Sequence, residues 1–563
     1  MSHVEKEYIV TVQKDVDWHQ LYHEIIHDTS SDDSVDSAIV PDRPCVSANE
    51  RPNNRRNTHY FLTDEEAISL RQDPRVLAVQ ALDEIPEPEI AAIQDGNFNR
   101  AGGDSGEQDN WGLLRHTALN NIYGSSFLDP EGAYDYVLDG TGVDIVIMDT
   151  GIQAGHPEWE NKIGVSRLVQ IDWYSASGVS GTQPANFYTD VSGHGTHCAG
   201  TMAGKTFGWA KNARIYSMTT YGNPGNSISF EDAVDCLIGW HNNKPIESST
   251  GVKRPTIVNM SFQYSWYLDT SVTPNEVSFS STGTGYDVTG GRYRGTAHSS
   301  TTRANLLSKG VIGSDRGRYL FGRKLATKDA DVEQLIANGI NVCTAAGNNY
   351  MKVDHPAGAD YNNYLTLDIS GTTRYNYYHR GSSPSVTEAG DTYTSTEKQD
   401  FTTNYNVATP YSPDGLSHFN DGFDVGSLDG SSIYSGGSYI DKKADFSESG
   451  LGVGIYAVGD NVISAYPNSL GVSYHDNSSH RQSKLSGTSM ASPQMCGMMA
   501  CLLQVHPDWT PAQVKNYFIN NSQNSLYSTG STIDYTTSSS LHGGHNRIAY
   551  LPMNGAKRFR HET

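Results

Sequence analysis

Short apolar strands that alternate with helical stretches after Trp111 constrain the fold of this 563-residue chain more than any other feature. Strands are predicted at 143–148, 256–260 and 340–344, where apolar and β-branched residues dominate. The stretches with helical spacing are 197–203, 230–241 and 329–338. A helix that connects two strands usually makes them parallel and covers one face of the sheet. We therefore predict an α/β fold with a mostly parallel sheet and helices on both faces.

The first 84 residues show a different pattern, typical of a small α+β unit. Residues 8–12 and 76–82 alternate like strands, and residues 17–26 carry apolar side chains at helical spacing. The sequence Thr-Asp-Glu-Glu at 63–66 is a capping box that opens a second, short helix. The predicted organisation is an α+β domain at 1–84, an exposed linker at 85–108 and the α/β domain at 109–563.

Two long stretches interrupt the α/β pattern, at 264–327 and at about 359–420. Both are rich in Tyr, Thr, Ser and Gly and hold few apolar runs. We therefore expect them to be insertions on the surface of the core.

Charge and hydropathy exclude some partners. The formal net charge of −23 argues against nucleic acid and anionic membrane surfaces. The sequence shows neither a signal-peptide pattern nor an apolar run long enough to cross a bilayer. This leaves intracellular action, release on lysis and packaging in an assembly open, and it does not define the oligomeric state.

Asp149 and His194 each stand in a short motif that also has a structural interpretation. Asp149 follows the strand 143–148, at the edge where parallel sheets place their sites, although a turn-capping Asp would look the same. His194 lies between two glycines and begins a run of small residues, typical of a helix packed closely on a sheet. His194 and His197 lack a Cys or carboxylate at zinc-ligand spacing, so no metal site is predicted and a core histidine is the other interpretation.

Ser489 and Asn348 provide the complementary groups. Ser489 precedes an apolar helical stretch at 495–505, so it is either an N-cap or a hydroxyl beside unpaired backbone N–H groups that would stabilise an oxyanion. Pro493 is expected in the opening turn of that helix, where proline is tolerated. Asn348 follows the strand 340–344, where its amide could be a second oxyanion donor or an ordinary loop residue.

Five motifs follow one another in a specific order: DTG at 149–151, HGTHCAGT at 194–201, IVNMSF at 257–262, AAGN at 345–348 and SGTSMASP at 486–493. Together they resemble the subtilisin-like (subtilase) family of serine proteases, and the stretch after His194 is similar to its proteinase K branch. The order Asp, His, Ser is that of subtilisin. No GxSxG elbow surrounds Ser489, which argues against a lipase.

The resemblance implies a serine endopeptidase that forms an acyl-enzyme on Ser489 and acts on a polypeptide substrate. His194 would take the proton of the hydroxyl, Asp149 would orient the imidazole, and Asn348 with the Ser489 N–H would hold the oxyanion. The substrate would pair in extended form with two backbone segments. The candidate substrate-binding residues are Gly222, Gly225, Ser227, Ser261, Phe262, Gln263 and Gly347.

The N-terminal unit resembles the propeptide of the same family, through YIVTVQ at 8–13 and DPRVLAVQALDE at 73–84. In that family the propeptide aids folding, occupies the cleft with its tail and is cut off. The resemblance therefore implies that this unit is an intramolecular inhibitor. We expect self-cleavage within residues 84–108.

The sequence departs from the family at the substrate groove and at the calcium sites. Phe262-Gln263-Tyr264 replaces small residues, so bulk is expected to crowd the groove and weakens the expectation of a large apolar P1 residue. Glu158 stands where many relatives have an Asp calcium ligand, and Gly454 stands where proteinase K-like enzymes have another. No cofactor is predicted. Calcium binding by the acidic insertions is left open, with no assignable site.

Cys198 lies one helical turn after His194, on the same side of the predicted helix. Relatives with a thiol at this place are sensitive to mercurials, and the same sensitivity is expected here.

A catalytically silent relative that acts as a structural or binding component of a larger assembly is the alternative function, with the two insertions making the contacts. The presence of all three triad residues and Asn348 favours the enzyme.

Overall fold

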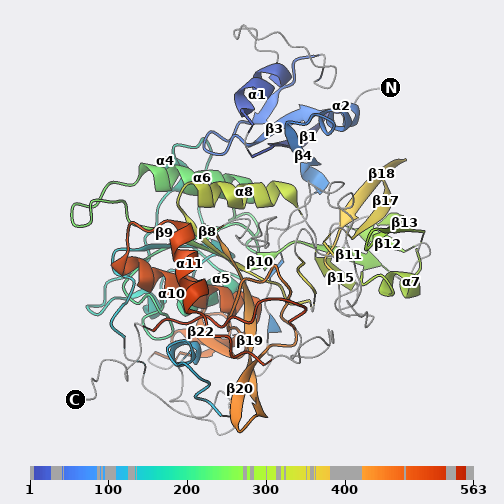
Figure 1. The fold of residues 1–563 in the computed structure, drawn as a ribbon. Helices are drawn as coiled ribbons and strands as arrows, with labels where there is room; N and C mark the ends of the chain where they lie inside the picture. Colours follow the sequence, from blue (N-terminus) through green and yellow to red (C-terminus); the bar gives the residue numbers. More distant parts are fainter. Residues whose placement is uncertain are drawn as a thin grey trace, which may run out of the picture.

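A computed structural model defines the architecture (Figure 1). The residues it describes are 5–14, 16–26, 41, 43–84, 89–90, 93–94, 110–124, 134, 136–269, 275–278, 285–299, 301–311, 319–322, 325–349, 351–354, 360–361, 363–369, 371–380, 421–474, 477–527 and 541–552. Most of the predicted linker 85–108 and much of the predicted insertion 359–420 lie outside these residues.

A mostly parallel sheet forms the centre of the large domain. Its strands, in spatial order, are β20 (Ser438–Lys443), β19 (Phe423–Ser435), β16 (Asn341–Ala345), β9 (Thr256–Met260), β7 (Asp144–Asp149) and β8 (Arg214–Thr219), with β21 (Ile455–Val458) also paired to β19. Only the pairing of β19 with β20 is antiparallel among these neighbours.

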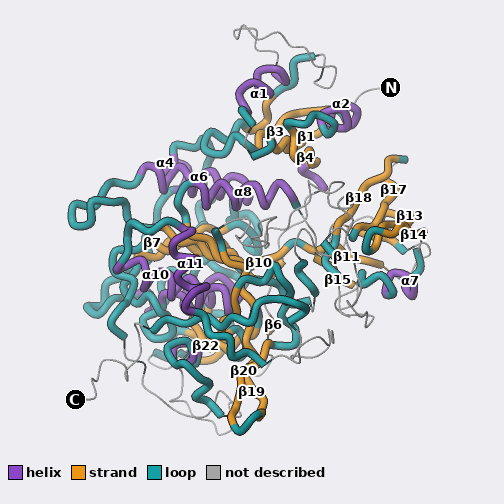
Figure 2. The backbone as a smooth tube through the Cα atoms, in the orientation of Figure 1, coloured by secondary structure: helices purple, strands orange, loops and turns teal. Residues whose placement is uncertain are grey.

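Helices cover both faces of this sheet, as Figures 1 and 2 show. The helices α5 (His194–Ala203) and α10 (Thr488–Val505) pack on one face, and α6 (Phe230–Asn243) and α8 (Ala326–Ala337) pack on the other. Side chains of β7 alternate accordingly, because Ile147 belongs to the first core and Met148 to the second. The predicted α/β fold class is therefore confirmed.

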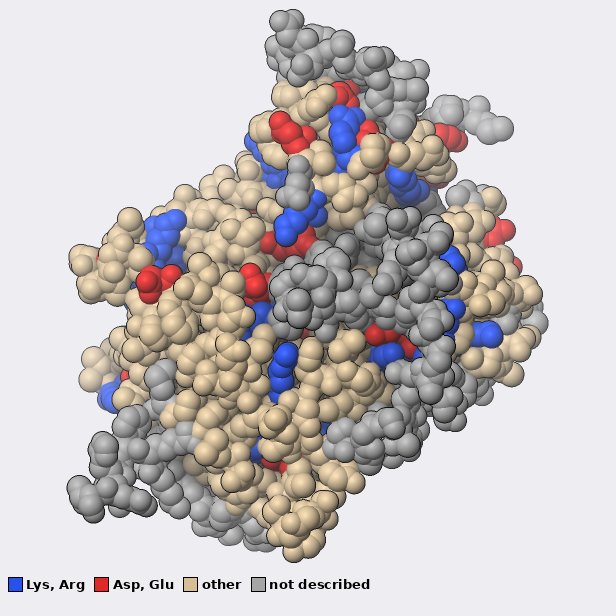
Figure 3. Space-filling view, viewed as in Figure 1, with Lys and Arg blue, Asp and Glu red and all other residues tan. Residues whose placement is uncertain are grey.

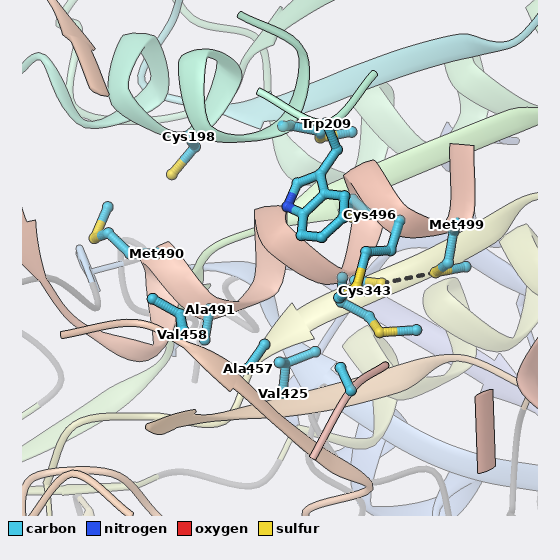
Figure 4. Packing of buried hydrophobic residues seen from close by; sticks show 14 of the residues in the cluster. Cys198, Trp209, Cys343, Val425, Ala457, Val458, Met490, Ala491, Cys496 and Met499 are labelled. Atoms are coloured by element: carbon cyan, nitrogen blue, oxygen red, sulfur yellow. Dashed lines mark hydrogen bonds between the residues drawn. The ribbon is translucent and has the colours of Figure 1, made fainter. Parts of the chain in front are cut away.

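The core on the α5 and α10 face is rich in sulfur and small side chains. Figure 4 shows Cys198, Trp209 and Met490 in this cluster, where Cys343 Sγ lies 3.3 Å from Met499 Sδ. Small residues let the two helices lie close to the sheet, which brings their N-terminal ends to its carboxyl edge.

The N-terminal unit is a four-stranded antiparallel sheet with two helices. The strands are β2 (Ser47–Asn49), β3 (Asn57–Leu62), β1 (Lys6–Val12) and β4 (Val76–Ala81), and the helices are α1 (Trp18–Ile26) and α2 (Asp64–Leu70). The predicted capping box of α2 is confirmed, because Thr63 Oγ1 accepts from the Glu66 N–H at 3.2 Å and the Glu66 carboxylate accepts from the Thr63 N–H at 2.7 Å.

The described parts of the two predicted insertions form one separate sheet with its own apolar core. Its strands are β15 (Tyr319–Gly322), β11 (Ser265–Asp269), β12 (Glu276–Ser278), β13 (Tyr286–Tyr293), β17 (Tyr364–Ile369) and β18 (Thr372–Tyr377), with β14 (Thr296–His298) beside β13 and the helix α7 (Arg303–Leu307) after it. The antiparallel pairing of β13 with β17 joins the two insertions.

Two short strands of the linker pair with strands beside the central sheet. The first, β5 (Glu89–Ile90), pairs with β10 (Phe262–Gln263). The second, β6 (Ile93–Gln94), pairs with β24 (Arg481–Ser486), which also pairs with β22 (Val462–Tyr466) and β23 (Val472–Ser473). The remaining short elements are η1 (Leu82–Glu84), α3 (Gly112–Arg115), η2 (Pro157–Trp159), α4 (Trp173–Ser177) and α11 (Pro511–Asn521). Among the described helices, none combines the length and apolarity that a membrane crossing requires.

Candidate active site

Three predicted residues from distant segments come together at the carboxyl edge of the central sheet. Asp149 is the last residue of β7, His194 is the first residue of α5, and Ser489 is the second residue of α10. All three side chains are buried. His194 Nδ1 lies 2.7 Å from Asp149 Oδ1, so the carboxylate accepts a hydrogen bond from the imidazole and fixes its orientation.

Asp190 fixes His194 relative to β7. Its Oδ1 accepts from the Thr150 hydroxyl at 3.0 Å and from the Gly193 N–H at 2.8 Å, and its Oδ2 accepts from the Thr196 N–H at 2.9 Å. The carboxylate thus caps the first turn of α5 while it holds the residue that follows Asp149. Sequence reasoning missed Asp190, although an Asp a few residues before a helix start is a capping signal.

The electrostatics of the two histidines on α5 differ. Burial lowers the pKa of His194, but the negative charge of Asp149 opposes this, and the pKa is raised well above its ordinary value. Burial lowers the pKa of His197 to about 3, and its Nε2 lies 3.0 Å from the Val462 carbonyl oxygen. His197 is therefore a neutral core histidine.

The hydroxyl of Ser489 is turned toward β9. Its Oγ donates to the Ser261 carbonyl oxygen at 3.0 Å, and His194 Nε2, which is buried, has no hydrogen-bond partner among the described residues. Cys198 lies between the His194 ring and the Ser489 backbone, because its Sγ lies 4.0 Å from His194 Nδ1 and 3.4 Å from the Ser489 carbonyl oxygen. Catalytic hydrogen bonds are often incomplete before substrate binds, and a rotation about one side-chain bond redirects a Ser hydroxyl.

Pro493 lies in the second turn of α10, because the helix begins at Thr488. The expectation that Pro493 lies in the opening turn is wrong. Proline has no N–H, so the carbonyl of Ser489, four residues earlier, lacks its usual helix donor. The Ser261 hydroxyl donates to this carbonyl at 3.0 Å, and the Cys198 thiol contacts it as well. These two contacts take the place of the missing helix hydrogen bond and hold the Ser489 backbone against Ser261 and Cys198.

Asn348 lies next to the start of α10. Its Oδ1 accepts from both the N–H and the hydroxyl of Thr488, each at 2.9 Å. The Thr488 hydroxyl in turn accepts from the Gly347 N–H at 3.0 Å. Because Oδ1 accepts these two hydrogen bonds, the donor of this amide is its Nδ2 group.

The predicted substrate-binding residues fall into two groups. The strand β5 pairs antiparallel with β10, so Phe262 and Gln263 pair with an extended segment of the chain itself. Gly222 lies beside Thr150, because a side chain added there would come within 2.7 Å of the Thr150 methyl group. In contrast, no described strand pairs with residues 222–227, and Gly225 and Ser227 are not brought to the triad by any hydrogen bond among the described side chains.

The bulk of Phe262 does not crowd the groove as expected. Its ring is buried in an aromatic cluster, with ring centroids 5.1 Å from Tyr221 and 6.0 Å from Phe230. Gln263, which is only half-buried, lies beside Gly347 instead.

Tyr221 is a second residue that sequence reasoning missed. Its phenol is buried, and burial together with the charge of Asp149 raises its pKa well above the ordinary value, so the hydroxyl stays protonated beside the triad carboxylate. A single Tyr after a strand carries no local pattern that identifies it.

Among the residues that the structure describes, one group of side chains has the spacing of metal ligands, and it includes two triad residues. Ligand atoms of Asp149, His194 and Cys198 lie within 4.8 Å of one another. Glu158, the predicted counterpart of a calcium ligand, instead accepts from the Tyr474 hydroxyl at 2.6 Å and from the Thr206 N–H at 3.0 Å. Protein donors therefore occupy its carboxylate.

A parallel sheet with a buried Asp–His pair and a Ser at a helix N-terminus on its carboxyl edge has the arrangement of a serine-hydrolase site. The sequence profile of the subtilase family matches residues 140–540 of this chain. The chain therefore belongs to the subtilase family.

Individual relatives are distant. The chain is 28% identical to the extracellular serine proteinase of Thermus sp. (strain Rt41A) over 38% of its own length and 43% of the relative's. It is 24% identical to the subtilisin-like serine protease Cur l 4.0101 of Cochliobolus lunatus, over 76% of its own length and 58% of the relative's. It thus spans about half the length of the curated relatives it matches. Fervidolysin from Fervidobacterium pennivorans, a solved structure, aligns over 98% of this chain and 61% of its own at 15% identity, with a TM-score of 0.47.

Proposed function

We propose that this protein is a serine endopeptidase that hydrolyses peptide bonds through an acyl-enzyme on Ser489. The observation that carries the proposal is the 2.7 Å hydrogen bond between Asp149 and a buried His194 whose other ring nitrogen has no described partner. A neutral His194 takes the proton of the Ser489 hydroxyl as the oxygen bonds to the substrate carbonyl carbon. The same proton then goes to the leaving amine as the C–N bond breaks, and water hydrolyses the ester by the reverse sequence.

Asp149 keeps the imidazole in the tautomer that accepts at Nε2, and its charge stabilises the imidazolium that forms. The oxyanion lies between Asn348 Nδ2 and the N–H of Ser489. The start of an 18-residue helix, α10, adds the positive end of its dipole at the same place. Loss of one such donor costs on the order of 3 kcal/mol in subtilisin, a member of the same family.

The N-terminal unit acts in this proposal as an intramolecular inhibitor. Arg51 forms a salt bridge to Asp331 of α8 at 2.8 Å, with both side chains buried. The Asn57 amide also donates to Asp331, at 2.8 Å. Figure 3 shows basic and acidic side chains close together where the N-terminal unit meets the large domain. The pairing of β5 with β10 then holds the linker against the segment that a substrate would occupy.

The proposal also includes self-processing within residues 84–108, and labelling tests the catalytic part directly. A fluorophosphonate probe should modify the wild-type chain at Ser489 and leave the Ser489→Ala variant unmodified, with hydrolysis of an unfolded protein substrate lost in the same variant. A wild type that is folded but neither labelled nor active would favour the silent structural relative instead.

A further inference from the structure

The linker strands β5 and β6 pair with two different strands, β10 and β24, each of which ends close to the nucleophile in the sequence or by a hydrogen bond. In β5, Glu89 pairs with Gln263 and Ile90 pairs with Phe262. The pairing is antiparallel, so the chain advances toward Ser261 as it leaves Ile90. The Ser261 carbonyl oxygen is the group to which the Ser489 hydroxyl donates. The chain therefore enters the site along β10 and heads for Ser489.

On the other side the chain leaves along β24. Ile93 pairs with Ser486 and Gln94 pairs with Leu485, again antiparallel. Advancing from Ile93 to Gln94 thus moves the chain away from Ser489. Only two residues, Ala91 and Ala92, join the two strands. They lie outside the described residues, but both of their neighbours are held by the pairings.

Counting the two registers inward identifies one bond. Ile90 pairs with Phe262, the residue after Ser261, and Ile93 pairs with Ser486, the residue before Gly487. Ser261 accepts from the Ser489 hydroxyl, and Gly487 is two residues before Ser489 in the chain, so the two pairings bracket the nucleophile. We propose that the chain is its own first substrate at the Ala91–Ala92 bond and that the enzyme accepts a small side chain at the position before the cut. This inference rests on the proposed function.

The cleavage follows the steps given above. The Ser489 oxygen bonds to the Ala91 carbonyl carbon, the bond to the Ala92 nitrogen breaks, and His194 gives its proton to that nitrogen. Water then releases the Ala91 carboxylate. The product that contains the α/β domain would then begin with Ala92-Ile93-Gln94.

The surroundings of Gly347 support the inference that the substrate side chain before the cut is small. A substrate residue that pairs with Ser261 and points its carbonyl oxygen at Asn348 places its side chain near Gly347. A Cβ atom on Gly347 would lie 2.5 Å from Glu448 Oε1 and 3.0 Å from Gln263 Oε1. Both groups therefore already fill one side of this glycine, whose φ of +112° also requires glycine.

The buried side chain of Glu448 fills space beside Gly347. Its side chain is 3% exposed, and its backbone N–H donates to the Gly347 carbonyl oxygen at 3.0 Å, which holds it in place. Burial raises the pKa of its carboxyl well above the ordinary value. The buried Glu448 carboxyl beside Gly347 reduces the room for any large substrate side chain, Lys and Arg included.

The position of the cut is tested on the full chain. N-terminal sequencing and intact mass of the processed wild type should give a chain that begins at Ala92, and Ser489→Ala should stay uncut. Ala91→Phe should slow processing by about tenfold or more because the side chain does not fit, whereas the matched change Ala101→Phe should leave the rate unchanged. A new N-terminus at another residue, or equal rates for the two variants, would overturn the proposal.

The side-chain preference is tested with the processed enzyme and hexapeptides. Glu-Ile-Ala-Ala-Ile-Gln should be cut at its central bond about tenfold faster than peptides with Phe or Lys at the third position. Glu448→Ala should raise the relative rate for Phe. A preference for Lys would contradict the inference, as would a preference for Phe in the wild type. An enzyme that labels at Ser489 and cuts peptides without these preferences refutes only the inference, whereas one that neither labels nor cuts refutes the proposed function.

Discussion

Replacing Arg51 with Ala should speed the release of the N-terminal unit after processing. Arg51 is fully buried and pairs with Asp331 at 2.8 Å, and Asp331 is 1% exposed. Removing one partner of a buried ion pair costs about 3–5 kcal/mol, because the other charge is left buried. Asn54 and Asn57 still donate to the same oxygen of Asp331, at 2.5 and 2.8 Å, so we expect the lower end of that range.

A loss of about 3 kcal/mol corresponds to a change of roughly 150-fold in affinity, and such changes appear mainly in the dissociation rate. The assay follows the onset of peptide hydrolysis after processing of the full chain, since activity appears as the inhibitor leaves. Arg55→Ala is the matched control. Arg55 lies 4.0 Å from Glu50 and is 34% exposed, so its loss should change the onset by less than about fivefold.

A double-mutant cycle distinguishes the loss of this ion pair from a general folding defect. Asp331→Ala also leaves one buried charge, but Arg51→Ala combined with Asp331→Ala leaves none. The combined variant should therefore dissociate more slowly than the two single effects added together predict, with a coupling of about 1–3 kcal/mol. Equal onset rates for Arg51→Ala and Arg55→Ala, or strictly additive effects, would show that this pair does not hold the inhibitor.

Three further outcomes are expected of the processed enzyme. Asn348→Ala should lower kcat by about 10²–10³ with little change in KM, because the donor acts on the oxyanion that forms in the transition state; a loss confined to KM would contradict that role. One equivalent of a mercurial should abolish hydrolysis by the wild type and by the control Cys236→Ala, whose thiol lies on the other face of the sheet. Cys198→Ala should stay active, because the Cys198 thiol lies 4.0 Å from His194 Nδ1. An equally sensitive Cys198→Ala variant would refute this. The raised pKa of His194 means that its charged form stabilises the fold below pH 6.5, and that this stabilisation is lost as the pH rises through the folded-state pKa. Because only the neutral imidazole can act as a base, kcat/KM should rise with pH, and the midpoint of this rise should lie above 6.5. A midpoint below 6.5 would contradict the effect of Asp149 on the pKa of His194.

The parts of the site that sequence reasoning located are those that follow directly from a strand or open a helix. Asp149 ends β7 and Asn348 follows β16, so their place at the sheet edge was predictable from the apolar runs before them. Ser489 was predictable from the apolar helix after it, although the boundary of α10 was not: its first seven residues are too small and polar to show the helical pattern.

The parts that sequence reasoning missed depend on contacts between distant segments. The pairing of β13 with β17 joins residues such as Val288 and Leu367, and antiparallel strands so far apart give no local signal. Phe262 looked like bulk in the groove because alternation along a two-residue strand does not say which face is buried. The structure places its ring in the core and leaves Gln263 beside Gly347.

In the proposed mechanism, processing and inhibition are separable because each depends on different elements. The buried pair of Arg51 and Asp331 joins the N-terminal unit to α8, whereas β5 and β6 join the linker to β10 and β24. The proposed cut between Ile90 and Ile93 would remove none of the contacts with Asp331 of α8, so we expect the cut N-terminal unit to stay bound until those contacts break. Arg51→Ala should therefore speed the onset of activity without moving the cut, and Ala91→Phe should delay the cut without loosening the unit. A variant of either residue that changed both steps together would mean that docking and cleavage are one event.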